Sequence, residues 1–433
     1  MDGQVRVLDC TLRDGGHIVD GVFGENVIRY VIKKLVEAGT DIIEVGFLWE
    51  KYLGPDSARY YTIEDVKRVL PKDRGRSHFS LMADYIDLSH LEDCDGTVEY
   101  IRLSFKRSRL QWALDTLDIL NAKGYKVYIN PVNCNVYSDE EYLSVIKQAN
   151  EHGAYGFSIV DTFGVLRNKD LAAKYYLVES NLDKDRVIGV HLHENLGLAY
   201  SLAQHILDIK SPLRQVTIDG SLYGMGRVPG NLGIEKIMDH CNVTYGSGYN
   251  LAPAYDAIDD YIMPIFKQVP WGYMVPYAIS AQNDLHRTYA EYLMGKWKLK
   301  TSDINAILAQ VSHDEAELFN QEYIEELYRQ YLDVPVSEEA VTALGQRLSG
   351  KQVMILAPGQ SVKEHLSEVQ QYATRDDVVC IAVNFVPDFL QADMVFFSTI
   401  KRYETEGLRV DRDKTQVIVS SNLLRHVTEA DYT

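Results

Sequence analysis

The stretch VRVLDCTLRDGGH, residues 5–17, decides the fold that we expect for this chain. Residues 5–12 form an apolar run that is typical of a strand buried on both faces. Two glycines and three residues of different chemistry come at its end: the cation Arg13, the carboxylate Asp14 and the imidazole His17. In α/β folds the chemistry takes place at the carboxyl ends of such strands. The structural alternative is an Arg13–Asp14 ion pair with His17 capping a helix.

Further apolar, β-rich runs follow along the chain, and they end near residues 47, 84, 105, 132, 162, 193 and 222. Between them, amphipathic segments predict helices over residues 25–38, 109–123, 139–152, 169–180, 198–208 and 230–241. The connection at 88–93 looks short and irregular. Eight β/α repeats within about 240 residues predict an α/β fold of the (β/α)8 TIM-barrel type. A doubly wound open sheet is the alternative.

We expect three parts: a barrel catalytic domain over residues 1–250, a helical extension over 251–345 and a small Rossmann-like α/β domain over 346–433. The extension is rich in tyrosine and shows no clear strand, and we expect it to cover one end of the barrel. The run GKQVMILAPGQSVKEHL from Gly350 predicts a buried strand, a turn and a helix. More strands are expected at 378–384, 394–398 and 415–420. The chain ends soon afterwards, which is compatible with an incomplete domain, and its role stays open between phosphate binding and a structural or oligomerising function.

Composition excludes several classes of protein. The 433 residues carry a net charge of -18, and no block rich in Lys or Arg stands out, which argues against nucleic-acid binding. The apolar runs are too short to span a membrane, and the amino terminus does not resemble a signal peptide, so we expect a cytoplasmic protein. The five cysteines never form a CxxC pair, which argues against disulfides and a zinc–thiolate site.

A second motif, GVHLHENLGLA at residues 189–199, indicates a metal site. On a strand, His191 and His193 point to the same side, which suits two adjacent positions around one ion. Two histidines spaced in this way are more often a coincidence or structural packing than a metal site. A barrel, however, would bring the end of their strand near Asp14, which favours a metal site. Two imidazoles and a carboxylate suit Mn²⁺, Mg²⁺, Co²⁺ or Zn²⁺, and the ligand set does not choose among them.

Other polar residues end predicted strands: Glu44, Asn133 and Asp161. A barrel places them on the same rim as the metal residues. A 2-oxo acid could chelate an ion there, and the ion would stabilise the enolate that forms as a carbon–carbon bond breaks.

Four motifs in this order, TLRDG at 11–15, IIEVGF at 42–47, HLHENLGLA at 191–199 and DGSLYGMGRVPGN at 219–231, resemble those of the HMG-CoA lyase-like, or DRE-TIM, metallolyases. The resemblance covers most of residues 1–300. It implies that the metal ligands are Asp14, His191, His193 and, as in some members, Asn231. It also implies that Arg13 stabilises the enolate oxygen and that Glu44 orients Arg13.

Within this family the residues after Asp14 discriminate among chemistries. The condensing synthases usually read RDGEQ, whereas RDGGH resembles the 4-hydroxy-2-oxovalerate aldolases, in which the histidine is the base, implying that role for His17. HMG-CoA lyases use a cysteine in the loop that here reads GMGRVPGN, without one. The segment WGYMVPYAIS resembles the region that supplies a tyrosine in proton transfer, with Tyr277 preferred and Tyr273 second.

The sequence therefore predicts a divalent-metal-dependent aldolase, a carbon–carbon lyase that cleaves or forms a 4-hydroxy-2-oxo acid. The substrates are a 2-oxo acid of the pyruvate type and an aldehyde, the residues that bind them are Arg13, Asn133 and Asp161, and Mn²⁺ is the expected ion. We expect no dehydrogenase partner, and a homo-oligomer is compatible with this prediction. Two alternatives stay open: a Claisen-type acyltransferase that condenses acyl-CoA with a 2-oxo acid, and a non-catalytic barrel that serves as a binding scaffold.

Overall fold

A computed structural model of the chain describes residues 4–296, 299–333, 336–427 and 429–432. It divides into two compact units. The first comprises Met1–Glu291 and Ala316–Phe319, and the second comprises Tyr292–Glu315 and Asn320–Thr433. The first unit therefore continues beyond residue 250, where we predicted the barrel domain to end.

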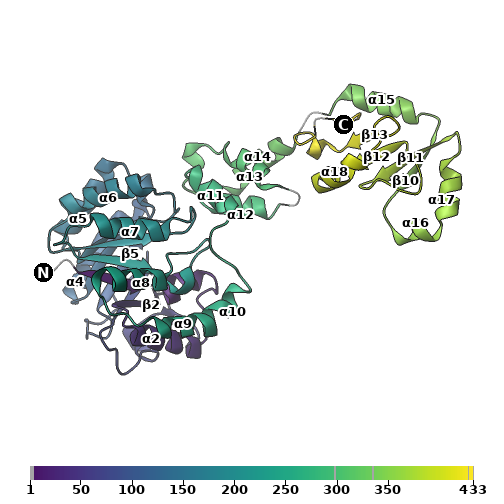
Figure 1. The fold of residues 1–433 in the computed structure, drawn as a ribbon. Helices are drawn as coiled ribbons and strands as arrows, with labels where there is room; N and C mark the ends of the chain where they lie inside the picture. Colours follow the sequence, from purple (N-terminus) through teal and green to yellow (C-terminus); the bar gives the residue numbers. More distant parts are fainter. Residues whose placement is uncertain (1–3, 297–298, 334–335, 428, 433) are drawn as a thin grey trace. The chain divides into compact units, whose positions relative to one another are not determined.

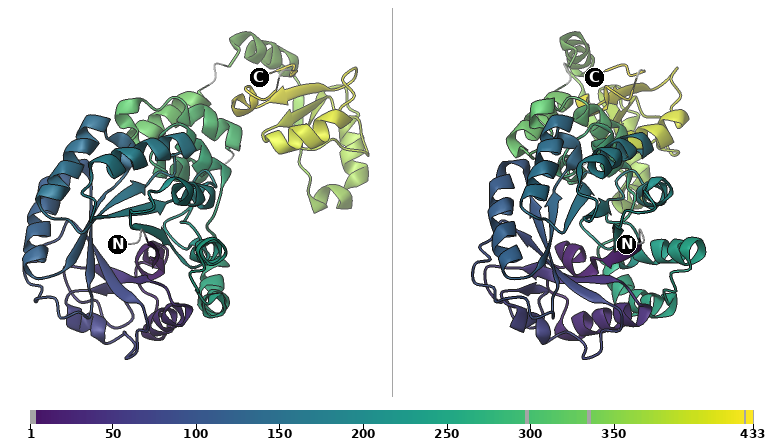
Figure 2. Two further views of the ribbon diagram at one scale, coloured as in Figure 1. Left: turned by 60° about the vertical axis from the view of Figure 1, so that its left-hand side comes forward. Right: turned by 90° about the vertical axis from the view of Figure 1, so that its left-hand side faces the viewer.

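The first unit is built on a closed barrel of eight parallel strands (Figures 1 and 2). In chain order these are β1 (Val5–Asp9), β2 (Ile42–Leu48), β4 (His78–Asp84), β5 (Tyr100–Phe105), β6 (Lys126–Pro131), β7 (Gly156–Asp161), β8 (Val187–Leu192) and β9 (Val216–Gly220). The barrel closes because β1 pairs with both β2 and β9. A two-residue strand, β3 (Arg59–Tyr60), adds to the end of β2. The predicted TIM barrel is confirmed.

Helices connect most of the barrel strands and surround them (Figure 2). They are α2 (Glu25–Ala38), α3 (Ile63–Lys67), α4 (Leu110–Ala122), α5 (Asp139–Glu151), α6 (Asn168–Asn181), α7 (Ala199–Ile209) and α8 (Ile234–Tyr245). Each long helix buries an apolar stripe against the strands; in α2 this stripe includes Ile28, Val31, Ile32 and Leu35. As predicted, no helix fills the connection between β4 and β5.

The first strand is shorter than predicted, and this difference shapes the site. It ends at Asp9, whose carboxylate accepts hydrogen bonds from the backbone N–H (2.9 Å) and the hydroxyl (2.7 Å) of Thr11. These bonds turn the chain into a short helix, α1 (Thr11–Asp14), followed by a 3₁₀ turn over Gly15–His17. Arg13 and Asp14 are therefore presented by a buried helical turn.

Residues after the barrel are helical, as predicted: α9 (Leu251–Ala257), α10 (Met263–Phe266), α11 (Val275–Gln282), α12 (Thr288–Met294), α13 (Thr301–Leu308) and α14 (Gln321–Leu332). The second unit contains α13 and α14 and, after them, α15 (Glu338–Leu348), α16 (Gln360–Glu364), α17 (Leu366–Ala373) and α18 (Ile400–Glu406). Its parallel sheet runs in the order β10 (Gln352–Leu356), β11 (Val378–Val383), β12 (Met394–Phe397), β13 (Gln416–Val419). This confirms a separate small α/β sheet. The prediction that its first strand is buried is wrong, because β10 forms an edge and leaves Ile355 71% exposed.

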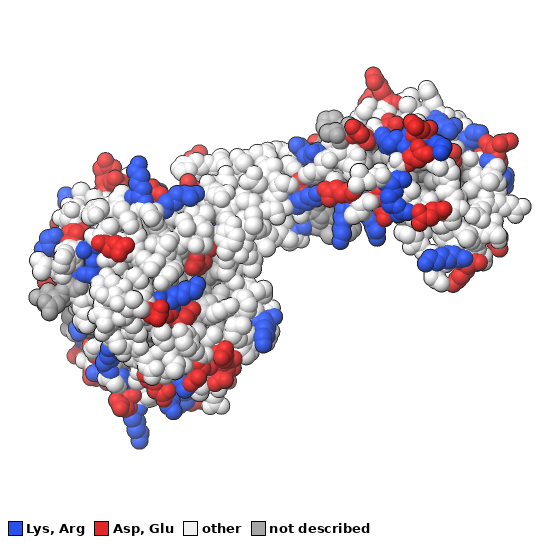
Figure 3. Space-filling view, in the orientation of Figure 1, with Lys and Arg blue, Asp and Glu red and all other residues white. Residues whose placement is uncertain are grey.

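The charged surface shows no segregation of sign on the face drawn in Figure 3, where acidic and basic side chains alternate over the barrel unit. No helix in the described part of the chain is long and apolar enough to cross a membrane.

Candidate metal centre and active-site cavity

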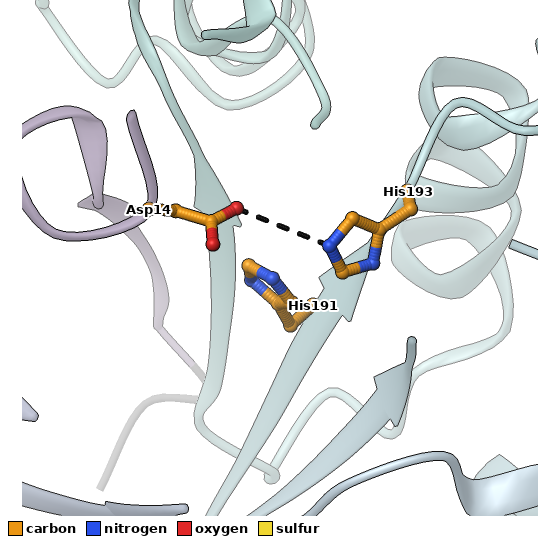
Figure 4. Close-up of side chains that lie close together, drawn as sticks. All are labelled: Asp14, His191 and His193. Carbon is orange, nitrogen blue, oxygen red and sulfur yellow. Dashed lines mark ion pairs between the residues drawn. The ribbon is translucent and has the colours of Figure 1, made fainter. Parts of the chain in front are cut away.

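Three predicted ligands meet at the carboxyl end of the barrel (Figure 4). Asp14 comes from α1, His191 lies on β8 and His193 follows that strand, and their ligand atoms all lie within 4.8 Å of one another. The Oδ2 atom of Asp14 is 3.9 Å from Nε2 of His193. This spacing leaves room for one ion between the side chains, because metal–ligand bonds to nitrogen and oxygen are about 2 Å long.

Hydrogen bonds assign the tautomer of each histidine. Nδ1 of His191 lies 3.0 Å from a carboxylate oxygen of Asp219, and Nδ1 of His193 lies 2.8 Å from the carbonyl oxygen of Asp161. Both acceptors require a proton on Nδ1, so Nε2 of each neutral ring carries a lone pair. Metal-binding histidines are typically held in this way, by a carboxylate or a carbonyl on the other ring nitrogen.

Asn231, the predicted additional ligand, is brought to the same place by a backbone bridge with His193. Its side-chain nitrogen donates to Asp14, while its buried Oδ1 has no hydrogen-bond partner in the described part of the chain. A buried acceptor without a partner is costly unless a ligand satisfies it. The orphaned oxygen and the two oriented imidazoles therefore fit a divalent cation.

Close packing at Gly226 keeps these groups together. A Cβ atom at this position would lie 2.7 Å from Oδ2 of Asp14 and 2.3 Å from Nδ2 of Asn231. Any larger residue would have to push these two side chains aside. The glycine-rich loop after β9 thus permits the approach of Asn231 to Asp14.

The protonation states also suit a cation. Burial alone would raise the pKa of Asp14, but Arg13 together with His17, His191 and His193 outweighs burial and holds this pKa below its ordinary value. Burial, followed by the influence of His191, lowers the pKa of His193 to about 4. The carboxylate is ionised and His193 is neutral at physiological pH, which are the forms that bind metals.

Arg13 is held by a network of buried charges. Its Nε donates to Glu44 at 2.6 Å and its Nη1 to Asp14 at 2.8 Å, while Nη2 is buried without a partner in the described structure. Glu44 is also bound by Arg102, which pairs with Asp219, the partner of His191. The structure thus brings Glu44 to Arg13, as predicted, and links both to the metal ligands. The Nη2 amino group of Arg13 is left to donate to a ligand.

A cavity of about 380 Å³ opens beside these groups and is lined by Arg13, Asp14, His17, His191 and His193. His17 lies at its wall, with Nε2 3.7 Å from Oδ1 of Asp14 and 41% of its side chain exposed. The volume is within the range of small-molecule sites. The cation, the imidazole and the metal triad therefore face the same space.

Two residues predicted to bind substrate have different surroundings. Asn133 follows β6, lines the cavity and is buried, yet neither atom of its amide has a hydrogen-bond partner in the described chain. The carboxylate of Asp161 instead accepts backbone N–H groups of Val165 (3.0 Å) and Leu166 (3.1 Å). Asp161 is not among the residues that line the cavity, so the contact with substrate that we predicted for it has no direct support in the geometry.

The two candidate tyrosines also lie outside the cavity wall. Tyr277 lies on α11 and donates its hydroxyl proton to Glu291 at 3.0 Å. Tyr273 is 58% exposed. A part for Tyr277 in proton transfer stays a prediction.

The sequence interpretation overlooked several residues of this site. Arg102 and Asp219 are charged residues within apolar strands, and that contrast was the available signal. Lys106 follows directly on a barrel strand, whereas no local pattern singles out Arg227 or His286, although all three line the cavity.

Comparisons with known proteins find similar sequences and a similar fold. The sequence profile of the HMGL-like family matches residues 101–253. A 4-hydroxy-2-oxovalerate aldolase of Geobacillus genomosp. 3 is 24% identical over 274 residues, which cover 58% of this chain and 78% of that protein. A 2-isopropylmalate synthase of Sulfolobus acidocaldarius is 26% identical over 263 residues, which cover 54% of this chain and 61% of that protein.

Among solved structures, the N-terminal domain of a candidate aldolase from Bacteroides vulgatus superposes with a TM-score of 0.57 at 22% identity. The match covers 67% of this chain and 97% of that domain, and it concerns the fold. Within its barrel, this chain is therefore similar to the HMGL-like family over residues 101–253, and the two sequence relatives extend the similarity to 54–58% of the chain.

Proposed function

We propose that this protein is a divalent-metal-dependent aldolase that cleaves or forms a 4-hydroxy-2-oxo acid. The observation that carries the proposal is the position of His17, which lines the same cavity as the metal triad and lies 3.7 Å from Asp14. An imidazole there can accept a proton from a substrate bound to the ion. The similarity to 4-hydroxy-2-oxovalerate aldolases supports this assignment.

Asp14, His191, His193 and Asn231 would hold the ion, for which Mn²⁺ is our first choice. When bound, a divalent ion supplies Lewis-acid polarisation of the 2-oxo acid. Side chains of this protein would carry out the proton transfer and stabilise the developing negative charge.

In the cleavage direction, His17 takes the proton of the C4 hydroxyl, and the C4–O bond becomes a carbonyl as the C3–C4 bond breaks. The electron pair of that bond passes to the C2 oxygen, and the unpartnered Nη2 of Arg13 donates a hydrogen bond to the developing negative charge. C3 then takes up one proton and His17 gives up the proton that it accepted, so that the pyruvate-type product is complete and the aldehyde leaves. Glu44 holds Arg13 in place, since it accepts the Nε proton at 2.6 Å.

A second candidate is a Claisen-type acyltransferase, favoured by the similarity to 2-isopropylmalate synthases. That reaction needs acyl-CoA and releases a free thiol, whereas aldol cleavage does not. The two candidates therefore differ in a product that is simple to measure.

The test is exchange of pyruvate methyl protons into deuterated water, measured by mass spectrometry with Mn²⁺ and then with EDTA. Exchange that requires the metal, together with cleavage of a 4-hydroxy-2-oxo acid, supports the aldolase. His17→Asn should lower cleavage about 10²- to 10⁴-fold and still bind Mn²⁺, whereas Asp14→Asn should lose both. His365→Asn is the matched control, because His365 is exposed and belongs to the other unit.

Absence of exchange with every divalent metal would exclude the proposal. Release of free thiol from acetyl-CoA in the presence of 2-oxo acids would assign the acyltransferase. A purified protein that binds no divalent metal would favour the scaffold alternative.

A further inference from the structure

Part of the cavity wall has no task in the reaction proposed above. This part comprises Lys106, Arg227, His286 and Asn133, which come from four separate places in the chain but line the same cavity. Lys106 and Asn133 follow barrel strands, Arg227 belongs to the loop after β9, and His286 lies between α11 and α12. We call these four residues the polar wall.

Lys106 and Arg227 carry positive charges that the described protein does not neutralise by direct contact. Neither side chain has an ion pair within 4.0 Å or a side-chain hydrogen bond to another described residue. By contrast, Arg107, which also lines the cavity, pairs with Glu141 at 3.2 Å, and Arg287 pairs with Glu291. Lys106 and Arg227 thus line the cavity without a carboxylate partner among the described residues.

His286 adds a neutral hydrogen-bond donor. Its Nδ1 accepts the backbone N–H of Thr288 at 3.3 Å, so the proton of the neutral ring lies on Nε2. Burial lowers the pKa of His286 to about 4, and the charges of Arg227, Arg287 and Lys106 act in the same direction. Every charged group named in this effect is a cation.

Asn133 provides an independent sign that a ligand binds here. Only 4% of this residue is exposed, and both polar atoms of its amide are buried without a partner in the described chain. Its backbone adopts a left-handed conformation, with φ of 60°, and its N–H donates to Thr162 at 2.7 Å. A buried amide that makes no hydrogen bond within the protein is expected to make one to a ligand or to water.

Two carboxylates, Asp84 and Glu317, also line the cavity. Neither forms an ion pair with Lys106 or Arg227 within 4.0 Å among the described residues. Partial desolvation raises the pKa of Asp84, and the charge of Lys106 acts in the opposite direction without direct contact. Lys106 therefore keeps its donors for a ligand.

We propose that the aldehyde partner of this enzyme carries an anionic group, a carboxylate or a phosphate, which Arg227, Lys106 and His286 bind while Asn133 donates to the same substrate. The inference rests on the proposed aldolase function. The metal and Arg13 would hold the 2-oxo acid, so the second anion belongs to the other substrate. A cavity of about 380 Å³ restricts that substrate to a short chain.

The test is calorimetric binding of paired aldehydes to the full-length protein loaded with Mn²⁺ and oxalate, which occupies the place of the 2-oxo acid. Succinic semialdehyde is compared with butanal, and glyceraldehyde 3-phosphate with glyceraldehyde. At least one anionic aldehyde should bind about 10- to 100-fold more tightly than its neutral counterpart, since hydrogen bonds to charged groups are the strong ones. The pair that shows the larger ratio distinguishes carboxylate from phosphate.

Variants assign the effect to the polar wall. Arg227→Gln and Lys106→Gln should each reduce the anionic-to-neutral ratio about tenfold, and Arg227→Lys should restore part of it. Arg109→Gln is the matched control, because Arg109 lies three residues from Lys106 but outside this cavity, stacked on Tyr85. Equal binding of neutral and anionic aldehydes, or an equal loss in Arg109→Gln, would overturn the inference.

The same aldehydes are then incubated with pyruvate, and the products are identified by mass. Selective binding without any aldol product would leave the anion site standing and reject the proposed reaction. Products formed equally well from neutral and anionic aldehydes would support the proposed aldolase reaction and reject the anion site.

Discussion

The Nδ1 atom of His191 lies 3.0 Å from the Oδ2 atom of Asp219, and both side chains are buried at the carboxyl end of the barrel. Asp219 also pairs with Arg102, which in turn contacts Glu44 and so connects to Arg13. One carboxylate thus sets the tautomer of a candidate metal ligand, His191, and joins it to Arg13, which we propose binds the substrate. The candidate metal ligand His191 and the proposed enolate-stabilising residue Arg13 therefore belong to one buried network of charges.

The first prediction concerns this carboxylate. Asp219→Asn removes the charged acceptor of His191, and we expect the affinity for Mn²⁺ to fall about 10- to 100-fold, as is usual when the hydrogen-bond partner of a metal-binding histidine is changed. Calorimetric titration of the metal-free protein measures it, and circular dichroism checks that the variant folds. Asp208→Asn, at an exposed position on α7, is the control. Unchanged affinity in a folded Asp219 variant would show that His191 does not need this partner.

The second prediction concerns Arg13. Arg13→Lys keeps the charge but cannot donate to Glu44, to Asp14 and to a substrate at once, because lysine has one nitrogen in place of the planar guanidinium. We expect kcat/KM for aldol cleavage to fall about 10²- to 10³-fold, the range seen when a donor to a developing oxyanion is lost.

Steady-state kinetics of Arg13→Lys should be accompanied by a Mn²⁺ titration. Affinity for the metal should stay within about threefold, since no ligand is removed. Arg29→Lys, which changes an exposed ion pair with Glu25, serves as control. If Arg13→Lys keeps nearly full kcat/KM, charge alone suffices and the role assigned to the guanidinium is wrong.

The third prediction concerns pH. The pKa of His286 is about 4 in the folded protein and about 6.5 in an unfolded chain, so the unfolded state binds more protons between these values. Stability therefore rises with pH across this window, and the unfavourable contribution of His286 appears as the pH falls below 6.5. Allowing for partial exposure, lowering the pH from 7 to 5 should cost about 1 kcal/mol through this residue.

Thermal unfolding in EDTA tests this effect by comparison with His286→Gln. The loss of Tm from pH 7 to pH 5 should be about 2 to 4 °C larger for the unmodified protein. Tryptophan fluorescence suits the measurement, because Trp49, Trp112 and Trp271 belong to the unit that holds the cavity. Identical pH dependence in the two proteins would show that His286 is not buried in neutral form.

Local sequence patterns were sufficient for the barrel and for the metal triad. Buried parallel strands need continuous apolar runs, and period-two alternation points His191 on β8 and His193 just after it to the same side. The eightfold repeat then brings Asp14 near them, because all strands of a parallel barrel end on one rim.

The exact course of the chain after β1 could not be predicted in the same way. Leu12 continues an apolar run, and only the hydrogen bonds from Thr11 to the Asp9 carboxylate end the strand earlier and form α1. Local residue propensity does not show whether a side chain will hydrogen-bond to the backbone in place of the next inter-strand hydrogen bond.

The amino-acid sequence by itself determined which residue types stand at the strand ends, and hence the barrel and the candidate metal ligands. Only the tertiary structure decided which polar groups find partners. It pairs Arg102 with Asp219 and gives Tyr277 a hydrogen bond to Glu291. It leaves Lys106 and Arg227 at the cavity wall. The physical reason is distance along the chain. Period and spacing act within a few residues, whereas ion pairing and burial depend on segments that are more than a hundred residues apart, such as Arg102 and Asp219.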